Sequence, residues 1–484
     1  MGNGERWLKR LGLGGGVLAF ALLALVPSGL HRVPGAGSRP AYAAAVASLM
    51  ALWWLTEAVP INWTACLPLL LFPLLGVFGK GFVGDAQIAV SPFLDAYIFL
   101  FLGGMAIGAA MEEWSLHRRV ALQIMGAIGT APQRLLLGML VSTAAVSLWI
   151  SNTATAVMML PIALAVLRQL ETSLGGRRLT HFGGALMLSV AYGSNVGGIG
   201  TKIGTGTNSI FCGFVSEKLH FDIAFLPYMA AALPFVLLFI PLTWLILWRE
   251  ARRDDLGEAQ GKEVLQRELA ALGPMSSQER TVAIVFAAAA LLWILGDPLK
   301  LLFTPLALSA GFKLAGKHVE ATVAMAAALA LLATRTLTLA GLKRLPWGTL
   351  LLLGGSFAMA AGLEGSGLSS WMSSHLTALA TLPPLAQILV TSVATVMLSA
   401  VASNTATVNV MLNLLPRSMP LLFATTIASS CDFALPAGTP PNAIVFGSGY
   451  VRLPTMMRIG FLLDLLAAVI VALYSHFWIR LIFP

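Results

Sequence analysis

Long apolar stretches recur along the whole chain, and short polar connections separate them. Many of these stretches approach the roughly 20 residues that an α-helix needs to cross about 30 Å of hydrocarbon. Because lipid offers the backbone no hydrogen-bond partner, we expect them to be membrane-spanning helices. The pattern predicts about eleven spans, at residues 15–32, 40–57, 60–78, 92–111, 182–216, 222–248, 281–297, 320–334, 346–366, 421–450 and 453–482.

Two further apolar stretches, residues 133–166 and 384–416, each have a polar interruption near the middle. Unpaired polar groups are costly in lipid, so an interruption at membrane depth marks a place where the helix breaks. We therefore predict two re-entrant hairpins, each of which leaves the membrane on the side where it entered. The expected fold is an all-α membrane protein with about eleven transmembrane helices plus two hairpins.

The composition supports this class and excludes others. Of the 484 residues, 57% are hydrophobic and only 11% are charged, which is too little polar surface for a water-soluble protein of this size. The formal net charge is +9, but the basic residues are spread over connecting loops, so we expect no nucleic-acid partner. The three cysteines lie in or beside apolar segments and predict neither a disulfide framework nor a metal site.

The distribution of Lys and Arg predicts the orientation in the membrane, because cytoplasmic connections carry an excess of basic residues. With a cytoplasmic N-terminus and two non-crossing hairpins, most of the 30 Lys and Arg residues fall on the cytoplasmic side. We therefore expect a multi-pass protein of a bacterial-type inner (plasma) membrane, with its C-terminus outside. The one long polar loop, residues 249–280, is predicted to be a cytoplasmic linker that only connects two halves.

The chain repeats itself, with its landmarks in the same order in both halves. The sequence Ser-Asn-Thr-Ala-Thr begins at Ser151 and again at Ser403, 252 residues later. Two other landmarks recur, namely Leu102-Gly103-Gly104 as Leu353-Gly354-Gly355, and Gly204-Thr205-Gly206-Thr207-Asn208 as Gly438-Thr439-Pro440-Pro441-Asn442. The predicted spans make the two hairpins enter from opposite sides, so the halves are expected to be inverted repeats, as in secondary transporters.

The two polar interruptions are the predicted binding site. The N-terminus of a broken helix presents bare N–H groups that suit an anion, whereas unwound carbonyls and hydroxyls suit a hard cation. A single Ser-Asn-Thr in a membrane helix more often bonds two helices together. Two copies, each followed by a Gly-Thr-x-x-Asn break, favour a ligand site. Neutral tips cannot offset the charge of a dianion at membrane depth, so a bound cation is expected beside it.

These motifs resemble those of the divalent anion/sodium symporter (DASS) family of di- and tricarboxylate transporters. The resemblance rests on both Ser-Asn-Thr tips and on three further motifs, Trp54-Leu55-Thr56-Glu57-Ala58-Val59-Pro60, Gly197-Gly198-Ile199-Gly200-Thr201 with Gly204-Thr205, and Leu435-Pro436-Ala437-Gly438-Thr439-Pro440-Pro441-Asn442. It implies a secondary active transporter of small divalent anions, with C4-dicarboxylates such as succinate, malate or fumarate as substrates. Sodium is the implied coupling ion, and no cofactor is expected.

The resemblance also implies roles for individual residues. The substrate carboxylates are expected to meet Asn152, Thr153, Thr205, Asn404, Thr405, Thr439 and Pro440. One sodium site is expected at Ser147, Ser151, Asn152, Gly200 and Gly204, and a second at Ser399, Ala402, Asn404 and Gly438. The family further implies a homodimer with an elevator mechanism. The scaffold is then residues 1–131 and 281–383, and the moving transport domain is residues 132–248 and 384–484.

Two charged residues depart from the expected pattern and are treated as modifiers of the coupling. Lys202 lies inside the first break, where it either replaces the first sodium ion or contacts a substrate carboxylate, or else points along the break to water. Asp432 lies four residues before Pro436 in the second break. It is expected to pair with a polar neighbour, to help bind a cation or to accept a proton.

Other functions remain open at this point. A sodium-independent dicarboxylate exchanger and a carrier of inorganic anions such as sulfate or phosphate both fit the hairpin chemistry. A channel fits less well, because paired helix breaks suit alternating access better than a continuous pore. An enzyme is not expected, since the sequence has no Ser/His pair in a suitable context, no His-Glu-x-x-His motif and no nucleotide-binding loop.

Overall fold

The computed structural model describes residues 3–256, 262–309, 311–375 and 381–483. Within these ranges the regular structure is helical, and no strand is present apart from an isolated bridge between Val33 and Gly37. Nine helical segments in the same ranges are long and apolar enough to cross a membrane, and two shorter apolar helices accompany them. The expectation of an all-α membrane protein is confirmed.

The first half of the chain runs from the N-terminus to the linker. Its helices are α1 (Asn3–Leu25), α2 (Arg39–Thr56), α3 (Ile61–Thr64), α4 (Leu67–Leu75), α5 (Gly81–Val90), α6 (Ala96–Glu113), α7 (Leu116–Ile128), α8 (Pro132–Ser147), α9 (Asn152–Ser173), α10 (Thr180–Gly198), α11 (Gly206–Lys218) and α12 (Phe225–Ala251).

The second half repeats much of this order. Its helices are α13 (Lys262–Leu272), α14 (Ser277–Ile294), α15 (Gly296–Ser309), α16 (Gly316–Ala333), α17 (Leu339–Lys343), α18 (Trp347–Gly365), α19 (Leu368–His375), α21 (Pro384–Val401), α22 (Asn404–Leu414), α23 (Met419–Ser430), α24 (Pro440–Phe446), α25 (Leu453–Tyr474) and α26 (Arg480–Ile482).

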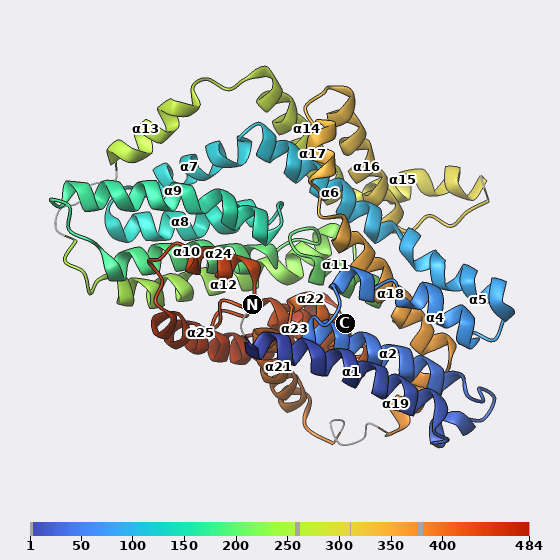
Figure 1. Cartoon of the computed structure of the whole chain (residues 1–484). Coiled ribbons are helices and arrows are strands. Elements are labelled where there is room, and N and C mark those ends of the chain that lie inside the picture. The colour runs from blue at the N-terminus through green and yellow to red at the C-terminus, as the bar shows by residue number, and fades with distance from the viewer. Residues whose placement is uncertain (1–2, 257–261, 310, 376–380, 484) are drawn as a thin grey trace.

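Both predicted hairpins are pairs of helices that meet at a Ser-Asn-Thr tip. The helix α8 ends at Ser147 and α9 begins at Asn152, and likewise α21 ends at Val401 and α22 begins at Asn404. Figure 1 shows α8 and α9 running side by side next to α10, and α21 lying near α23 and α22. The opposite orientation of the two halves in a membrane stays a prediction.

The two long predicted spans at 182–216 and 421–450 are each two helices with an irregular break between them. The first break, residues 199–205, joins α10 to α11, and the second, residues 431–439, joins α23 to α24. The glycines and prolines in these segments explain the interruption, because both residue types are poor helix formers. Backbone carbonyls that are unpaired at a break are available to a ligand.

Some elements differ from the sequence expectation. Helices α5, α7, α13, α15 and α19 lie in stretches where no span was predicted. The linker was expected to connect the halves and nothing more, but α13 packs on α7 and α9, and Arg118 pairs with Glu268 across that contact. Amphipathic segments that are too short to span escape a search for long apolar runs.

The helices pack closely where glycine replaces a side chain. A Cβ on Gly197 of α10 would lie 2.3 Å from the carbonyl oxygen of Ala144 in α8, and one on Gly355 of α18 would lie 2.1 Å from that of Ala65. Small residues at such crossings let membrane helices approach each other. The first contact sets the hairpin against the broken helix, and this places the hairpin tip beside the break.

Candidate functional site

Both hairpin tips and both helix breaks line one cavity of about 240 Å³. Most of its polar wall comes from the tips and the breaks, and Asn195 of α10 and Thr349 of α18 add two further polar side chains. The rest comes from α3, α6 and the starts of α11 and α18. The lining residues are Ile61, Phe101, Met105, Ser151, Asn152, Thr153, Asn195, Gly204, Thr205, Gly206, Pro346, Thr349, Ser403, Asn404, Thr405, Gly438, Thr439, Pro440 and Pro441. Segments about 250 residues apart in the sequence therefore meet at a single place.

The serine of each tip caps the helix that follows it. The hydroxyl oxygen of Ser151 accepts a hydrogen bond from the N–H of Ala154 at 3.4 Å, and that of Ser403 accepts one from Ala406 at 3.2 Å. Serine is a preferred N-cap because its oxygen satisfies an N–H that has no partner within the helix. The tip sequence thus starts a new helix at each Asn and directs both helix N-termini at the cavity.

A second serine in each hairpin ties the tip to the broken helix. The Ser147 hydroxyl lies 3.0 Å from Asn152 Oδ1 and 2.8 Å from the Ser194 carbonyl oxygen. The Ser399 hydroxyl lies 2.9 Å from Asn404 Oδ1 and 2.6 Å from the Ser429 carbonyl oxygen. A hydroxyl carries one hydrogen, so it can donate to only one of its two acceptors at a time. Each tip therefore holds a cluster of oxygens with too few hydrogens, which suits a hard cation.

An asparagine beyond each break holds the irregular backbone in place. Asn208 Nδ2 donates to the carbonyl oxygens of Gly198 at 2.8 Å and Thr201 at 2.6 Å. Asn442 Nδ2 donates to the carbonyl oxygens of Asp432 at 3.2 Å and Leu435 at 3.0 Å. Both asparagines are buried. These bonds satisfy carbonyls that the broken helices leave without partners, and they fix the backbone that faces the cavity.

The structure brings most of the predicted site residues together. All seven residues predicted to bind substrate line the cavity, and so do Ser151, Gly204 and Gly438 of the predicted sodium sites. Ser147 and Ser399 lie directly behind the tip asparagines through the contacts given above. Gly200 and Ala402 are not part of the cavity wall. The binding roles themselves stay predictions.

Three helices of eight or more residues have their first residue in the cavity wall, namely α9 with Asn152, α11 with Gly206 and α22 with Asn404. A helix N-terminus has unpaired N–H groups and the positive end of the helix dipole, which both stabilise an anion. The short helix α24 begins with Pro440 and Pro441, which have no N–H to offer. No Lys or Arg side chain lines the described cavity, so the positive field comes from backbone alone.

Lys202 is buried and paired, away from the cavity between the tips. Its Nζ lies 2.7 Å from Glu320 Oε2 and 3.0 Å from Oε1, and it also donates to the carbonyl oxygen of Ile223. Neither side chain is more than 1% exposed. The ammonium also lies 5.5 Å from the centre of the Tyr97 ring. The expectation that Lys202 could reach water along the break is not what this geometry shows, because the Glu320 carboxylate holds the charge inside the protein.

Asp432 is also buried, in the second break. Its carbonyl oxygen accepts from Asn442, but neither carboxyl oxygen has a hydrogen-bond partner among the described residues. A Cβ on Gly438 would lie 2.0 Å from Asp432 Oδ2, so the carboxyl group packs directly against a glycine of the cavity wall.

The sequence analysis missed several residues at the site. Asn195 lines the cavity and donates from Nδ2 to Thr439 Oγ1 at 3.2 Å and Asn442 Oδ1 at 3.4 Å. A buried amide in the apolar stretch before the first break was the available signal. Glu320, the partner of Lys202, lies 118 residues away in the sequence. Phe101 and Met105 face the tips from α6, and nothing in the apolar pattern separates them from ordinary packing residues.

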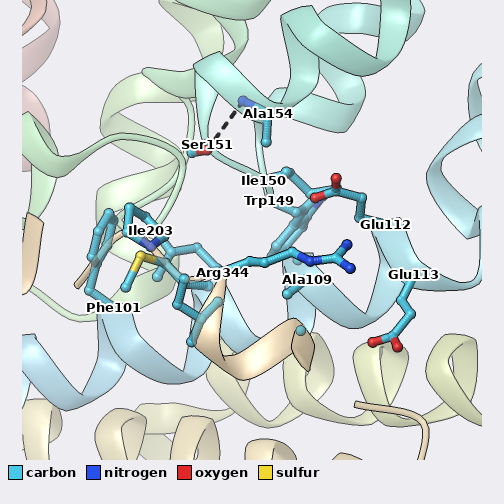
Figure 2. A pocket seen from close by; sticks show the side chains of 15 residues that line it. Phe101, Ala109, Glu112, Glu113, Trp149, Ile150, Ser151, Ala154, Ile203 and Arg344 are labelled. Carbon is cyan, nitrogen blue, oxygen red and sulfur yellow. Dashed lines mark hydrogen bonds between the residues drawn. The ribbon is translucent and has the colours of Figure 1, made fainter. Parts of the chain in front are cut away.

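A second cavity of about 360 Å³ adjoins the first and shares Phe101, Met105, Ser151 and Pro346 with it. We call this second cavity the vestibule. Figure 2 shows the Arg344 side chain extending across the vestibule, with the carboxyl groups of Glu112 and Glu113 nearby and the capped tip at Ser151 on the opposite wall. The vestibule therefore brings charged side chains to one entrance of the tip cavity.

Comparison with known proteins agrees with this geometry. The family described as "Sodium:sulfate symporter transmembrane region" matches residues 16–483. The sodium-dependent dicarboxylate transporter SdcS of Staphylococcus saprophyticus is 32% identical over 96% of this chain and 90% of its own length. SdcS of Staphylococcus aureus (strain USA300) is 33% identical over 90% of this chain and 85% of its own length.

A solved structure shares the fold at low sequence identity. The crystal structure of the Alcanivorax borkumensis YdaH transporter covers 99% of this chain and 98% of its own chain, with a TM-score of 0.56 and 15% identity. That likeness concerns the fold alone. This chain belongs to the sodium:sulfate symporter family, which is the divalent anion/sodium symporter (DASS) family that its motifs resemble.

Proposed function

We propose that this protein is a sodium-coupled secondary active transporter of C4-dicarboxylates such as succinate, malate or fumarate. The observation that carries the proposal is the single cavity to which both tips contribute Ser, Asn and Thr and at which three helices begin. Its volume, about 240 Å³, is below the roughly 300–1,000 Å³ of sites for drug-sized ligands and suits a small acid. The two Staphylococcus relatives are sodium-dependent dicarboxylate transporters, which supports the same substrate class.

Binding of the acid depends on sodium in this proposal. The two carboxylates of the substrate meet the N–H groups and hydroxyls of the two tips, where Asn152 and Asn404 both line the cavity. Dipoles alone do not neutralise a dianion in a site at membrane depth. Sodium ions at the oxygen clusters around Ser147 and Ser399 supply the missing positive charge, so sodium binds before the acid and completes its site.

An elevator movement is supported by how the cavity wall divides. The lining residues of both tips and both breaks belong to the predicted transport domain, whereas Ile61, Phe101, Met105, Pro346 and Thr349 belong to the predicted scaffold. Of these five scaffold residues only Thr349 has a polar side chain, so the scaffold wall forms few specific bonds with the polar site and the loaded transport domain can slide past it. The predicted homodimer would hold the scaffold still in the membrane, as the family resemblance implies.

The vestibule is the proposed route between the cavity and the cytoplasm in this state. Arg344 lies on a connection that the distribution of basic residues places inside, and the vestibule leads from there to Ser151. The structure would then represent an inward-facing state, in which substrate and sodium leave toward the cytoplasm.

Uptake of labelled succinate by proteoliposomes tests this function. We expect uptake to be driven by an inward sodium gradient and to fall to background when choline replaces sodium. Asn152→Ala and Asn404→Ala should each abolish uptake, because each removes an oxygen of a tip. Asn413→Ala is the matched control, since Asn413 bonds to the Asn409 carbonyl of its own helix and lies outside the cavity.

The alternatives give different outcomes in the same assay. Uptake that needs internal dicarboxylate but no sodium would identify an exchanger and overturn the proposed coupling. The family description names sulfate, so sulfate must be tested as a competitor. Inhibition of succinate uptake by sulfate at equal concentration, together with labelled sulfate uptake at a comparable rate, would assign an inorganic anion instead.

A further inference from the structure

Asp432 has a buried carboxyl group that the proposed transport site does not yet use. The residue is 0% exposed, and neither of its carboxyl oxygens has a hydrogen-bond partner in the described part of the chain. A buried carboxylate without a partner is strongly destabilising, so such groups in proteins are paired, protonated or bound to a cation. An unsatisfied acid that packs against a glycine of the cavity wall therefore points to a missing ligand.

The neighbouring acid, Asp464, does have a hydrogen-bond donor for its carboxyl group. Asp464 of α25 is 2% exposed and accepts a hydrogen bond from the N–H of Phe433 at 2.8 Å. Asp464 thereby holds the backbone next to Asp432. It also places a second carboxyl group nearby and increases the negative field there, and this strengthens the requirement for a cation at Asp432.

The two halves of the chain show which position Asp432 occupies. Asn208 bonds to the carbonyls ten and seven residues before it, and Asn442 does the same in the second half. These bonds pair Gly198 with Asp432 and Thr201 with Leu435. The same spacing from the asparagine pairs Gly204 with Gly438. The residue that matches Asp432 in the first half is therefore a glycine.

That glycine faces the first predicted sodium site. A Cβ on Gly198 would lie 2.1 Å from Asn152 Oδ1, the oxygen that also contacts the Ser147 hydroxyl. A side chain at this position is thus directed at the oxygen cluster of the tip. In the first half this position is Gly198, which has no side chain. A cation bound there would therefore contact neutral oxygens only.

In the second half the same position carries a carboxyl group. The Asp432 carboxyl lies against Gly438, where a Cβ would be 2.0 Å from Oδ2 and 2.5 Å from Oδ1. We propose that Asp432 supplies a charged carboxylate ligand to a monovalent cation, sodium, at the second break, so that the two cation sites of this protein differ in charge. This inference rests on the proposed sodium-coupled function.

The chemistry of the surrounding groups suits this role. Hard cations prefer oxygen ligands, and carboxylate oxygens bind them more strongly than neutral ones. The Asn195 amide oxygen is a further buried acceptor without a described partner, and its Nδ2 points to the Asp432 carbonyl at 3.5 Å. One carboxylate among neutral oxygens balances one positive charge, which favours a monovalent ion. When this site is empty, the uncompensated carboxylate repels the dianion, and this makes substrate binding strictly dependent on the ion.

The test is the sodium dependence of an isosteric variant, Asp432→Asn. We expect the sodium concentration for half-maximal succinate uptake to rise at least tenfold, while the KM for succinate at saturating sodium changes less than threefold. Thermal unfolding of the purified protein gives a second readout that needs no transport. Sodium in place of choline should raise the Tm of the wild type, and this rise should be reduced in the variant, because an ion that binds only the folded state stabilises it.

Two further variants complete the test, one as a substitute for Asp432→Asn and one as a control. Asp432→Gly reproduces the residue of the first half, and it replaces the Asn variant in both assays if the latter is not stable in detergent. Asp255→Asn is the matched control, because this acid is 81% exposed and lies 3.7 Å from the Arg177 guanidinium in a surface ion pair. A sodium requirement within twofold of the wild type in the Asp432 variants overturns the inference and leaves the transport function intact. Wild-type uptake without sodium dependence overturns both.

Discussion

Matching residues of the two halves do not form the same hydrogen bonds. The Thr439 hydroxyl oxygen accepts hydrogen bonds from the Asn442 N–H at 3.3 Å and from Asn195 Nδ2 at 3.2 Å, and so caps α24. Thr205, its counterpart, lies at the N-cap of α11, but its side chain forms no capping hydrogen bond there. The Thr205 hydroxyl can therefore donate to a substrate carboxylate at no cost to the helix.

This asymmetry predicts different effects for the same substitution. Thr205→Val should raise the KM for succinate about 10- to 100-fold with little change in stability, because a hydrogen bond to a charged group contributes about 1.5–3 kcal/mol. Thr439→Val should also lower the free energy of unfolding, by about 1 kcal/mol, through the lost helix cap. Uptake kinetics and thermal unfolding of each purified variant separate the two cases. Equal loss of stability in both variants would contradict the assignment.

At the scale of elements, a buried ion pair links Lys202 in the first break to Glu320 on α16. It joins a segment of the predicted transport domain to a helix of the predicted scaffold, with both side chains at most 1% exposed. Trp293 of α14 donates from Nε1 to the backbone carbonyl oxygen of Glu320 at 3.0 Å, and this bond connects α14 to the part of α16 that carries the pair. If an elevator movement shifted this break past α16, Lys202 would either separate from Glu320 or take Glu320 with it.

The Lys202–Glu320 pair should stabilise the fold only while both charged residues are present. Glu320→Gln leaves the Lys202 ammonium buried without a counter-charge, and we expect a loss of about 3–5 kcal/mol in unfolding free energy. Replacing both residues by Met should recover most of that loss, since apolar residues of similar volume often substitute for a buried ion pair. Thermal unfolding in detergent measures both effects.

A partly exposed ion pair, Asp95 with Lys317, provides the control for these variants. Asp95→Asn breaks the partly exposed pair with Lys317, 2.9 Å apart, but keeps a residue able to cap α6, so it should cost at most about 1 kcal/mol. A stable double-Met variant should keep ordinary sodium dependence. Loss of that dependence would show that Lys202 acts in ion coupling or substrate binding directly, as one hypothesis from the sequence holds.

For the whole molecule, the contacts within each helix pair agree with the predicted topology. The helix α8 contacts α9 and α21 contacts α22, and we expect each pair to return the chain to the side of the membrane from which it came. The remaining spans then alternate as the distribution of Lys and Arg predicts. We therefore keep the expectation of a cytoplasmic N-terminus and a C-terminus outside.

Fusion reporters test this orientation. Alkaline phosphatase fused after residue 484 should be active, because it folds only outside the cytoplasm, and green fluorescent protein at the same place should be dark. Inserted in the 249–280 linker, the two reporters should behave in the opposite way. An active phosphatase in the linker would reverse the orientation and would place the vestibule on the outer side.

Much of the fold could be predicted from the sequence, because lipid imposes a simple rule on composition. Any segment at membrane depth must satisfy its backbone internally, so long apolar runs have to be helices and polar interruptions have to be breaks. The repeated tips at Asn152 and Asn404 identified the site for the same reason, since polar groups at that depth need partners. Short helices such as α5 and α7 were missed because no such rule constrains their length.

Tertiary structure alone decided which groups meet. The sequence contains Lys202 and Glu320 far apart, and only packing brings them within 2.7 Å and removes both from water. Only packing also leaves the Asp432 carboxyl without a partner against Gly438, where the first half has a glycine. The chain by itself determined the helices, the breaks and the repeated tips, because these follow from local composition and solvation. Charge partners and cavity walls depend on contacts between distant segments, which local composition does not encode.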